Sequence, residues 1–192
     1  MMAFLNKLTL ILMMKFFKLL FSIIFMLMVF NANAQKNLVE NGGFEDNLYG
    51  WNDNGGKITP WDFKSGKNSC AIITTGTDKW VGIDQSIRIP KKTGSLEFSA
   101  WIKANNVVKG EHDWDGAIFS IAFLDGSDKE IEGGDNIAHL TGDQNWTRFS
   151  KIIKVPARAV SFKILLAMGN ASGGMIIDDV YAAVVNDQLV VK

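Results

Sequence analysis

Short runs of alternating apolar and polar residues constrain this chain more than any other feature. The run at 95–104 is the clearest. Leu96 and Phe98 lie on one face of it and Glu97 lies on the other, which predicts a strand with one face in a core and the other in water. The run at 116–124 is apolar on both faces, as in a central strand. Further strands are predicted at 57–63, 70–75, 80–89, 147–155, 159–168 and 174–185.

Turn residues separate these runs, and the three prolines stand at strand margins, where a missing N–H does least harm. Turns are predicted at 41–43, 54–56, 92–94, 125–127, 133–135 and 172–174. No stretch after residue 34 has the 3.6-residue period of a long helix, and no repeat or linker divides residues 35–192. The sequence therefore predicts one all-β domain over residues 35–192, folded as an antiparallel β-sandwich.

Residues 1–34 have the layout of a signal peptide. Lysines precede an apolar run at 19–30, and Ala32-Asn33-Ala34 supplies a small-x-small cleavage site. The run is short for a membrane anchor, which needs about 20 apolar residues. Cleavage after Ala34 predicts a mature protein that is secreted or periplasmic and carries no membrane anchor. A start at the tandem methionines 13 and 14 is an alternative that the sequence leaves open.

The predicted mature chain is mildly acidic. Its first 34 residues hold three of the 20 basic side chains and none of the 20 acidic ones, which leaves 17 basic against 20 acidic groups. A nucleic-acid-binding protein needs a basic face to neutralise phosphates, so no nucleic-acid partner is predicted. Cys70 is the only cysteine and lies in an apolar run. We interpret it as a core side chain rather than a nucleophile.

Short motifs recur along the predicted domain. They are Asn41-Gly42-Gly43-Phe44-Glu45 with Gly50-Trp51, Ser65-Gly66-Lys67 with Ser69, Trp146-Thr147-Arg148, Val155-Pro156 and Ile177-Asp178-Asp179-Val180. In their order and spacing they resemble the carbohydrate-binding modules of the galactose-binding-like jelly-roll superfamily, especially families four, nine and twenty-two. The resemblance covers residues 38–185 and is not specific for a sugar. It implies a jelly roll that binds a polysaccharide or oligosaccharide.

The resemblance also implies a structural calcium ion where the two chain ends meet. By position, Glu45 and Asp178 are the side-chain ligands, and carbonyl groups near Gly43 and Lys67 complete the set. Calcium binds six to eight oxygen atoms and mixes carboxylates with carbonyls. It would also explain an acid within an apolar strand, because an unpaired buried carboxylate is costly. The alternative is that Asp178 only accepts backbone hydrogen bonds at a strand junction.

Two tryptophans stand where a sugar ring could stack. Trp114 lies in a polar loop beside Asp113, where an exposed apolar ring indicates a ligand contact. The alternative is that its loop folds the ring over the core as a lid. Trp101 alternates with the polar Ser99 and Lys103, which puts it on the outer face of its strand. In families that bind along a cleft, the outer face of one sheet is the sugar-binding surface.

Trp80 is the next candidate, because Gln85 and Arg88 follow on the same predicted strand and could bond sugar hydroxyls. Trp61 is a weaker candidate, and Trp51 is interpreted as core because it belongs to the opening motif. The predicted ligand-binding set is Trp114, Trp101, Trp80, Gln85, Arg88 and Asp113.

The sequence favours a binding protein over an enzyme. Glycoside hydrolysis needs two carboxyl groups at a defined separation, and any acidic protein offers such pairs. Neither histidine has metal-ligand spacing or a nucleophile motif beside it. We therefore predict a non-catalytic module, with a protein-binding or adhesive sandwich and a small glycanase or polysaccharide lyase as alternatives. A separate glycan-processing complex is a further predicted partner.

Overall fold

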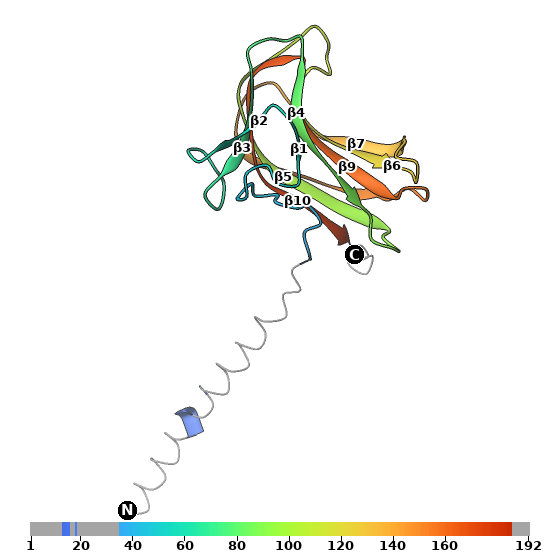
Figure 1. Ribbon diagram of the computed structural model, residues 1–192. Coiled ribbons are helices and arrows are strands. Elements are labelled where there is room, and N and C mark those ends of the chain that lie inside the picture. The colour runs from blue at the N-terminus through green and yellow to red at the C-terminus, as the bar shows by residue number, and fades with distance from the viewer. Residues whose placement is uncertain (1–12, 16–17, 19–34, 186–192) are drawn as a thin grey trace, which may run out of the picture. The chain divides into compact units, whose positions relative to one another are not determined.

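The computed structural model describes residues 13–15, 18 and 35–185. The chain divides into two units, Met1–Gln35 and Lys36–Lys192, and all the described strands belong to the second (Figure 1). The strands are β1 Asn52–Asn54, β2 Gly56–Thr59, β3 Ser69–Thr74, β4 Trp80–Arg88, β5 Ser95–Lys109, β6 Gly116–Leu124, β7 Glu130–Leu140, β8 Gly142–Lys154, β9 Ser161–Gly169 and β10 Ala171–Val185. Residues 36–185 contain no helix.

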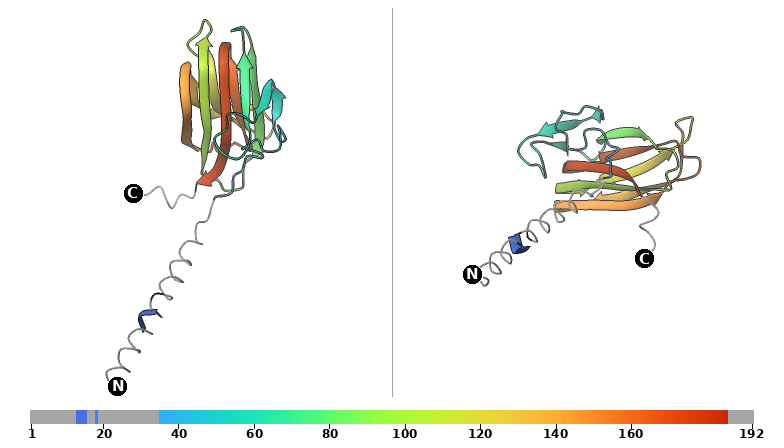
Figure 2. Two further views of the ribbon diagram at one scale, coloured as in Figure 1. Left: turned by 90° about the vertical axis from the view of Figure 1, so that its left-hand side faces the viewer. Right: turned by 90° about the horizontal axis from the view of Figure 1, so that it is seen from below.

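The strands form two five-stranded sheets in which every neighbouring pair is antiparallel. Sheet A has the order β1-β4-β9-β6-β7, and sheet B has the order β2-β3-β10-β5-β8. The chain changes sheet at seven of the nine connections between the described strands, all except β2–β3 and β6–β7, as in a jelly roll. In the left view of Figure 2, β8, β5 and β10 of sheet B run side by side. The predicted antiparallel β-sandwich is confirmed.

The core lies between the two sheets, and the alternation in the strands builds it. On β5, Leu96 and Phe98 are fully buried, whereas Glu97 between them faces outward. Phe98 meets Phe162 of β9 edge to face, with ring centroids 5.0 Å apart. The inner faces of the two sheets therefore interdigitate through aromatic contacts that stabilise the sandwich.

Two residues that the sequence assigns to the core are buried there. Trp51 packs on Phe44 with ring centroids 5.4 Å apart, and its indole N–H donates to the carbonyl of Asn41 at 3.2 Å. Cys70 is fully buried, and burial raises the pKa of its thiol to about 12. A thiol that stays protonated is a poor nucleophile, so Cys70 contributes packing only.

Strand β7 and the short edge strand β1 are absent from the predicted set. Gly133-Gly134-Asp135 is predicted as a turn, yet it lies inside β7. Gly133 has a φ of 108°, and the pairing of β6 with β7 shifts register between Ile121 and Phe123. Bulges at sheet edges bend a strand without ending it, and glycine is the residue that accepts a positive φ. The prediction of a strand over 57–63 is likewise too long, because β2 ends at Thr59.

The predicted signal peptide lies almost entirely outside the described residues and stays a prediction. Within the part of the chain that the structure describes, no helix is long and apolar enough to cross a membrane.

Candidate functional site

The outer face of sheet A, the A face, carries the first candidate surface. Its outward residues include Asn52 and Asn54 of β1, Trp80 and Asp84 of β4, Ala167 and Gly169 of β9, Ile118 of β6 and His139 of β7. The Trp80 ring lies over Gly169, because a Cβ on that glycine would sit 2.8 Å from Cζ2 and 3.0 Å from Cε2 of the indole. Trp80 is 46% exposed. The strand thus presents a flat ring on a floor of small residues.

A side chain at Gly169 should displace the Trp80 ring and weaken ligand binding. A contact below 3.0 Å forces the ring to shift, so we expect Gly169→Ala to lower the affinity for a ligand that stacks on Trp80 about tenfold, or 1.4 kcal/mol. Calorimetry measures the affinity, and tryptophan fluorescence reports a change in the environment of the Trp80 ring. Gly126→Ala is the matched control, since a Cβ there meets only Val160 Cγ2 at 3.9 Å. Unchanged affinity in Gly169→Ala would remove Trp80 from the site.

Trp114 lies at the same end of sheet A as Trp80. It stands two residues before Gly116, the first residue of β6. Register places Gly116 beside Gly169 of β9, and Gly169 beside Trp80 of β4. Neighbouring strands are about 4.8 Å apart, so the backbones of Trp80 and Gly116 are about 10 Å apart. Trp114 is 63% exposed and stacks on His112 with centroids 4.5 Å apart. The predicted alternative, a lid over the core, is wrong.

The loop that carries Trp114 is fixed by Asp115, which is buried. The carboxylate of Asp115 accepts from the backbone N–H of His112 at 2.9 Å and from the side-chain amide of Asn170 at 3.1 Å. Its backbone carbonyl contacts Nε2 of His139 at 3.0 Å. The backbone N–H of Asn170 in turn donates to the carbonyl of Lys79, next to Trp80. One hydrogen-bonded cluster therefore positions both candidate rings.

Polar groups lie at both edges of the A face, on β1 and β4 beside Trp80 and on β7 at the opposite edge. The amide of Asn52 donates to the carboxylate of Asp84 at 2.9 Å, and the amide of Asn54 donates to the carbonyl of Trp80 at 3.3 Å. His139 is exposed on β7. These planar amide, carboxylate and imidazole groups are donors and acceptors suited to sugar hydroxyls. Asn52, Asn54, Asp84 and His139 are missing from the predicted set, although alternation on β4 places Asp84 on the face of Trp80.

Trp101 lies on the opposite side of the sandwich. It is on the outer face of sheet B, the B face, which includes Glu97, Ser99 and Trp101 of β5, Arg148 of β8 and Tyr181 of β10. The ammonium group of Lys64 stands 4.2 Å from the centroid of the Trp101 ring. The sequence predicts that Trp101 faces outward on its strand, and in the structure it does. It does not bring this ring together with Trp80 and Trp114.

Comparison with protein families and solved structures shows which proteins this chain is similar to. The family model described as a carbohydrate binding domain matches residues 36–173, well over half of the chain. The chain belongs to this family. The match spans the described strands from β1 to β9 and the beginning of β10. No curated protein matches the chain.

Solved structures share the fold of this carbohydrate-binding domain. The CBM22-1 xylan-binding domain from Paenibacillus barcinonensis Xyn10C is 20% identical, with a TM-score of 0.55 over 81% of this chain and 98% of its own. TmCBM61 in complex with β-1,4-galactotriose is 17% identical, with a TM-score of 0.54 over 78% and 99%. The tailspike protein 4 domain of bacteriophage CBA120 has 18% identity and a TM-score of 0.58 over 78% of this chain, which spans only 21% of that protein.

Two of the predicted ligand contacts, Gln85 and Arg88, lie away from the Trp80 ring, whereas Asp113 lies next to Trp114 in the sequence. Gln85 is buried, and its side-chain amide bonds both the N–H and the carbonyl of Glu40, so it cannot reach a sugar. Gln85 follows Asp84 directly on β4, so the two side chains point to opposite faces, and that of Gln85 points inward. Arg88 faces outward at the far end of β4, about 26 Å from Trp80 at 3.3 Å per residue. Asp113 pairs with Lys109 at 2.6 Å and stays exposed beside Trp114.

The chain ends of the domain meet around Asp178, which is fully buried. Its carboxylate accepts from the backbone N–H groups of Lys64 at 2.7 Å, Ser65 at 3.0 Å and Asp179 at 2.7 Å. Burial raises the pKa of Asp178, and these hydrogen bonds partly oppose the effect. None of the ion pairs among the described residues includes Asp178. The three backbone N–H groups satisfy the buried carboxylate of Asp178, so these contacts do not by themselves require a cation.

Glu45 and Asp179 supply further oxygen atoms near the same junction. One oxygen of Glu45 accepts from the backbone N–H groups of Lys67 and Asn68 at 2.8 and 3.0 Å, which lowers the pKa of Glu45. A Cβ on Gly43 would lie 3.9 Å from Asp179 Oδ1 and 4.0 Å from Asp178 Oδ1. Carboxylate and carbonyl oxygens are the ligand types that calcium takes, and the junction offers both types. Lys67, however, presents its amide N–H to Glu45, and its carbonyl stays only a predicted ligand.

No group of three or more His, Cys, Asp or Glu side chains in the described ranges has the geometry of a metal site. A calcium ion here would therefore depend on backbone carbonyls as much as on Glu45 and Asp178. The alternative predicted from the sequence is that Asp178 only accepts backbone hydrogen bonds at a strand junction. The hydrogen bonds from Lys64 and Ser65 are the ones that this alternative predicts.

Proposed function

We propose that this domain binds a polysaccharide or oligosaccharide on the A face, without cleaving it, by stacking sugar rings on Trp80 and Trp114. The observation that carries the proposal is the pair of exposed tryptophans positioned by one hydrogen-bonded cluster at the same end of sheet A. Rings fixed before binding lose little conformational entropy when a ligand arrives. The backbones of Trp80 and Gly116 are about 10 Å apart across β9, so the two tryptophans stand on different strands and could contact separate sugar residues of one chain.

The polar neighbours of the rings complete such a site. Asp84 is oriented by Asn52 on the β1 side of Trp80. His139 stands on β7, the opposite edge strand, close to Gly116. Sugars stacked on the two rings would therefore meet planar polar partners at both edges of the sheet. Apolar surface and oriented polar groups together are the usual composition of a ligand site. Membership of the carbohydrate-binding domain family supports the same function.

The proposal of binding without cleavage rests on the carboxylates near the rings. A glycosidase needs a general acid whose pKa is raised so that it stays protonated. The hydrogen bond from Lys109 lowers the pKa of Asp113, and the amide of His112 lowers that of Asp115. Both groups are therefore carboxylates at neutral pH, which suits hydrogen-bond acceptance and not proton donation.

Three further features belong to the proposal. The protein is exported after removal of residues 1–34, and it carries a structural calcium ion held by Glu45, Asp178 and backbone carbonyls near Gly43 and Lys67. That ion would neutralise the buried carboxylate and tie the opening segment to β10. A separate glycan-processing enzyme or complex is the partner that such an exported binding domain would serve.

The test is a panel of glycans titrated into the mature protein by calorimetry and affinity electrophoresis. The panel starts with xylan, xylohexaose and β-1,4-galactotriose, because similar structures are described with these ligands or named for them. We expect binding to at least one glycan and no release of reducing sugar over many hours. Release of reducing sugar would make the protein an enzyme, and no binding to any glycan would favour the protein-binding alternative.

A further inference from the structure

The B face contains a pocket of about 310 Å³ that the A-face site does not use. It is lined by Glu97, Ser99, Trp101, Arg148, Asp179 and Tyr181. These residues come from three neighbouring strands, β8, β5 and β10, which run side by side in the left view of Figure 2. Register pairs Trp101 with Arg148 and Ser99 with Tyr181 on the outer face of sheet B, and alternation along β5 adds Glu97 to that face. Asp179 lies in the bulge of β10 between Asp178 and Tyr181. The pocket is therefore a product of the sheet and not of a mobile loop.

Arg148 is held in place within this pocket. Its Nη2 donates to the carboxylate of Glu97 at 3.1 Å and to the hydroxyl of Ser99 at 2.9 Å, and Ser99 is buried. A guanidinium group has five N–H donors, and these contacts use one nitrogen only. Because Glu97 offsets the positive charge, the remaining donors suit neutral hydroxyl groups rather than an anion.

Two aromatic side chains, Trp101 and Tyr181, line the same pocket. The Lys64 ammonium stands at the edge of this arrangement, 4.2 Å from the Trp101 ring centroid. Its segment is fixed by Asp62, which binds Lys103 at 2.6 Å and the indole N–H of Trp146 at 2.9 Å. An exposed lysine side chain is flexible, so a sugar ring can replace it on Trp101 at little cost.

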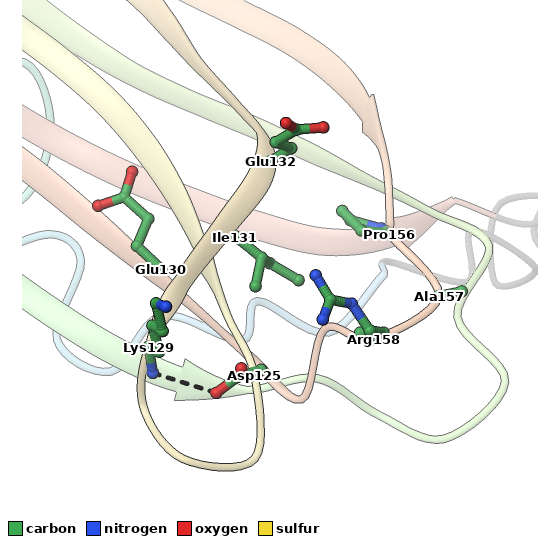
Figure 3. A pocket seen from close by; sticks show the side chains of 8 residues that line it. All are labelled: Asp125, Lys129, Glu130, Ile131, Glu132, Pro156, Ala157 and Arg158. Carbon is green, nitrogen blue, oxygen red and sulfur yellow. Dashed lines mark hydrogen bonds between the residues drawn. The ribbon is translucent and has the colours of Figure 1, made fainter.

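The largest described pocket has different chemistry. It has a volume of about 590 Å³ and lies between the turn at Asp125 and the segment at Pro156–Arg158 (Figure 3). Its lining has no aromatic ring, and charged side chains of both signs dominate it. The B-face pocket alone joins aromatic rings to oriented donors and acceptors among the pockets described.

We propose that the B-face pocket is a second glycan site, which takes one or two neutral sugar residues independently of the A face. The inference rests on the proposed function, since it assigns a second ligand of the same class. The two sites lie on the outer faces of opposite sheets, so one ligand segment cannot fill both. A single domain would then bridge two glycan chains, and on a polysaccharide the two sites would raise its apparent affinity through multivalency.

The experiment counts sites with variants of each face. The probe is whichever of xylohexaose and β-1,4-galactotriose binds in the glycan panel, titrated by calorimetry into wild type, Trp80→Ala, Trp101→Ala and the double variant. We expect two sites in wild type, one in each single variant and none in the double variant. Arg148→Gln should weaken the B-face site at least tenfold without removing an aromatic ring. Circular dichroism and thermal melting confirm that each variant folds.

Other outcomes separate the two proposals. One site that only Trp80→Ala removes would overturn the second site and leave the proposed function standing. One site that only Trp101→Ala removes would overturn the A-face proposal and the second site together. No binding of either probe would overturn both. Light scattering adds an independent measurement, because wild type should cross-link soluble polysaccharide and each single variant should not.

Discussion

Replacing Trp80 with alanine should weaken glycan binding at the A face about thirtyfold or more and leave the fold intact. Aromatic anchors dominate binding hot spots, and truncation of one costs about 2 kcal/mol or more. At 1.4 kcal/mol per decade of affinity this is about thirtyfold. The fold should survive, because Trp80 is 46% exposed and packs mainly on Gly169 outside the core.

Calorimetry with the best ligand of the glycan panel measures this effect. Tyr49→Ala is the matched control, because Tyr49 is a 61% exposed aromatic residue in the turn before β1. Trp114→Ala should lose affinity in the same way, since its ring is 63% exposed at the same end of sheet A. If wild type binds and both tryptophan variants bind equally well, the A face is not the site.

Removal of calcium should lower the melting temperature of the mature domain by about 5–10 °C. A ligand bound only by the native state stabilises it by about 2.7 kcal/mol at a hundredfold excess over Kd. For a domain of this size each kcal/mol shifts Tm by about 2–4 °C. The measurement is thermal melting with chelator, after unfolding and refolding in chelator to release a trapped ion, and again after calcium is restored.

Asp178→Asn should abolish the response to calcium, because the amide keeps the shape of the side chain and loses its charge. Asp113→Asn is the control, since Asp113 is an exposed carboxylate outside the junction. Glu45→Gln tests the same site if Asp178→Asn does not fold. A melting curve that ignores chelator, together with no metal by elemental analysis, would leave Asp178 with its backbone hydrogen bonds as its only role.

Alternation predicted most of the strands because the pleat of a strand converts a period of two directly into two faces. The strand at 80–89 and the strand at 116–124 are found within one residue of their predicted bounds. Strand β7 could not be predicted in this way. Its glycines form a bulge, and its side chains are largely exposed at the edge of sheet A, so neither alternation nor apolar content marks it.

The sequence by itself determined which residues face inward on clearly alternating strands such as β5, and it supplied the motifs that place the chain among carbohydrate-binding domains. Those properties are local, since they depend on the pleat of one strand and on short runs of residues. Only the tertiary structure decided which outward residues share a surface. Trp80 and Trp101 are both outward tryptophans, yet strand order puts them on opposite sheets. Pairing over long sequence separations, which no local pattern encodes, brings Trp114 to the same end of sheet A as Trp80 and buries Gln85 against Glu40.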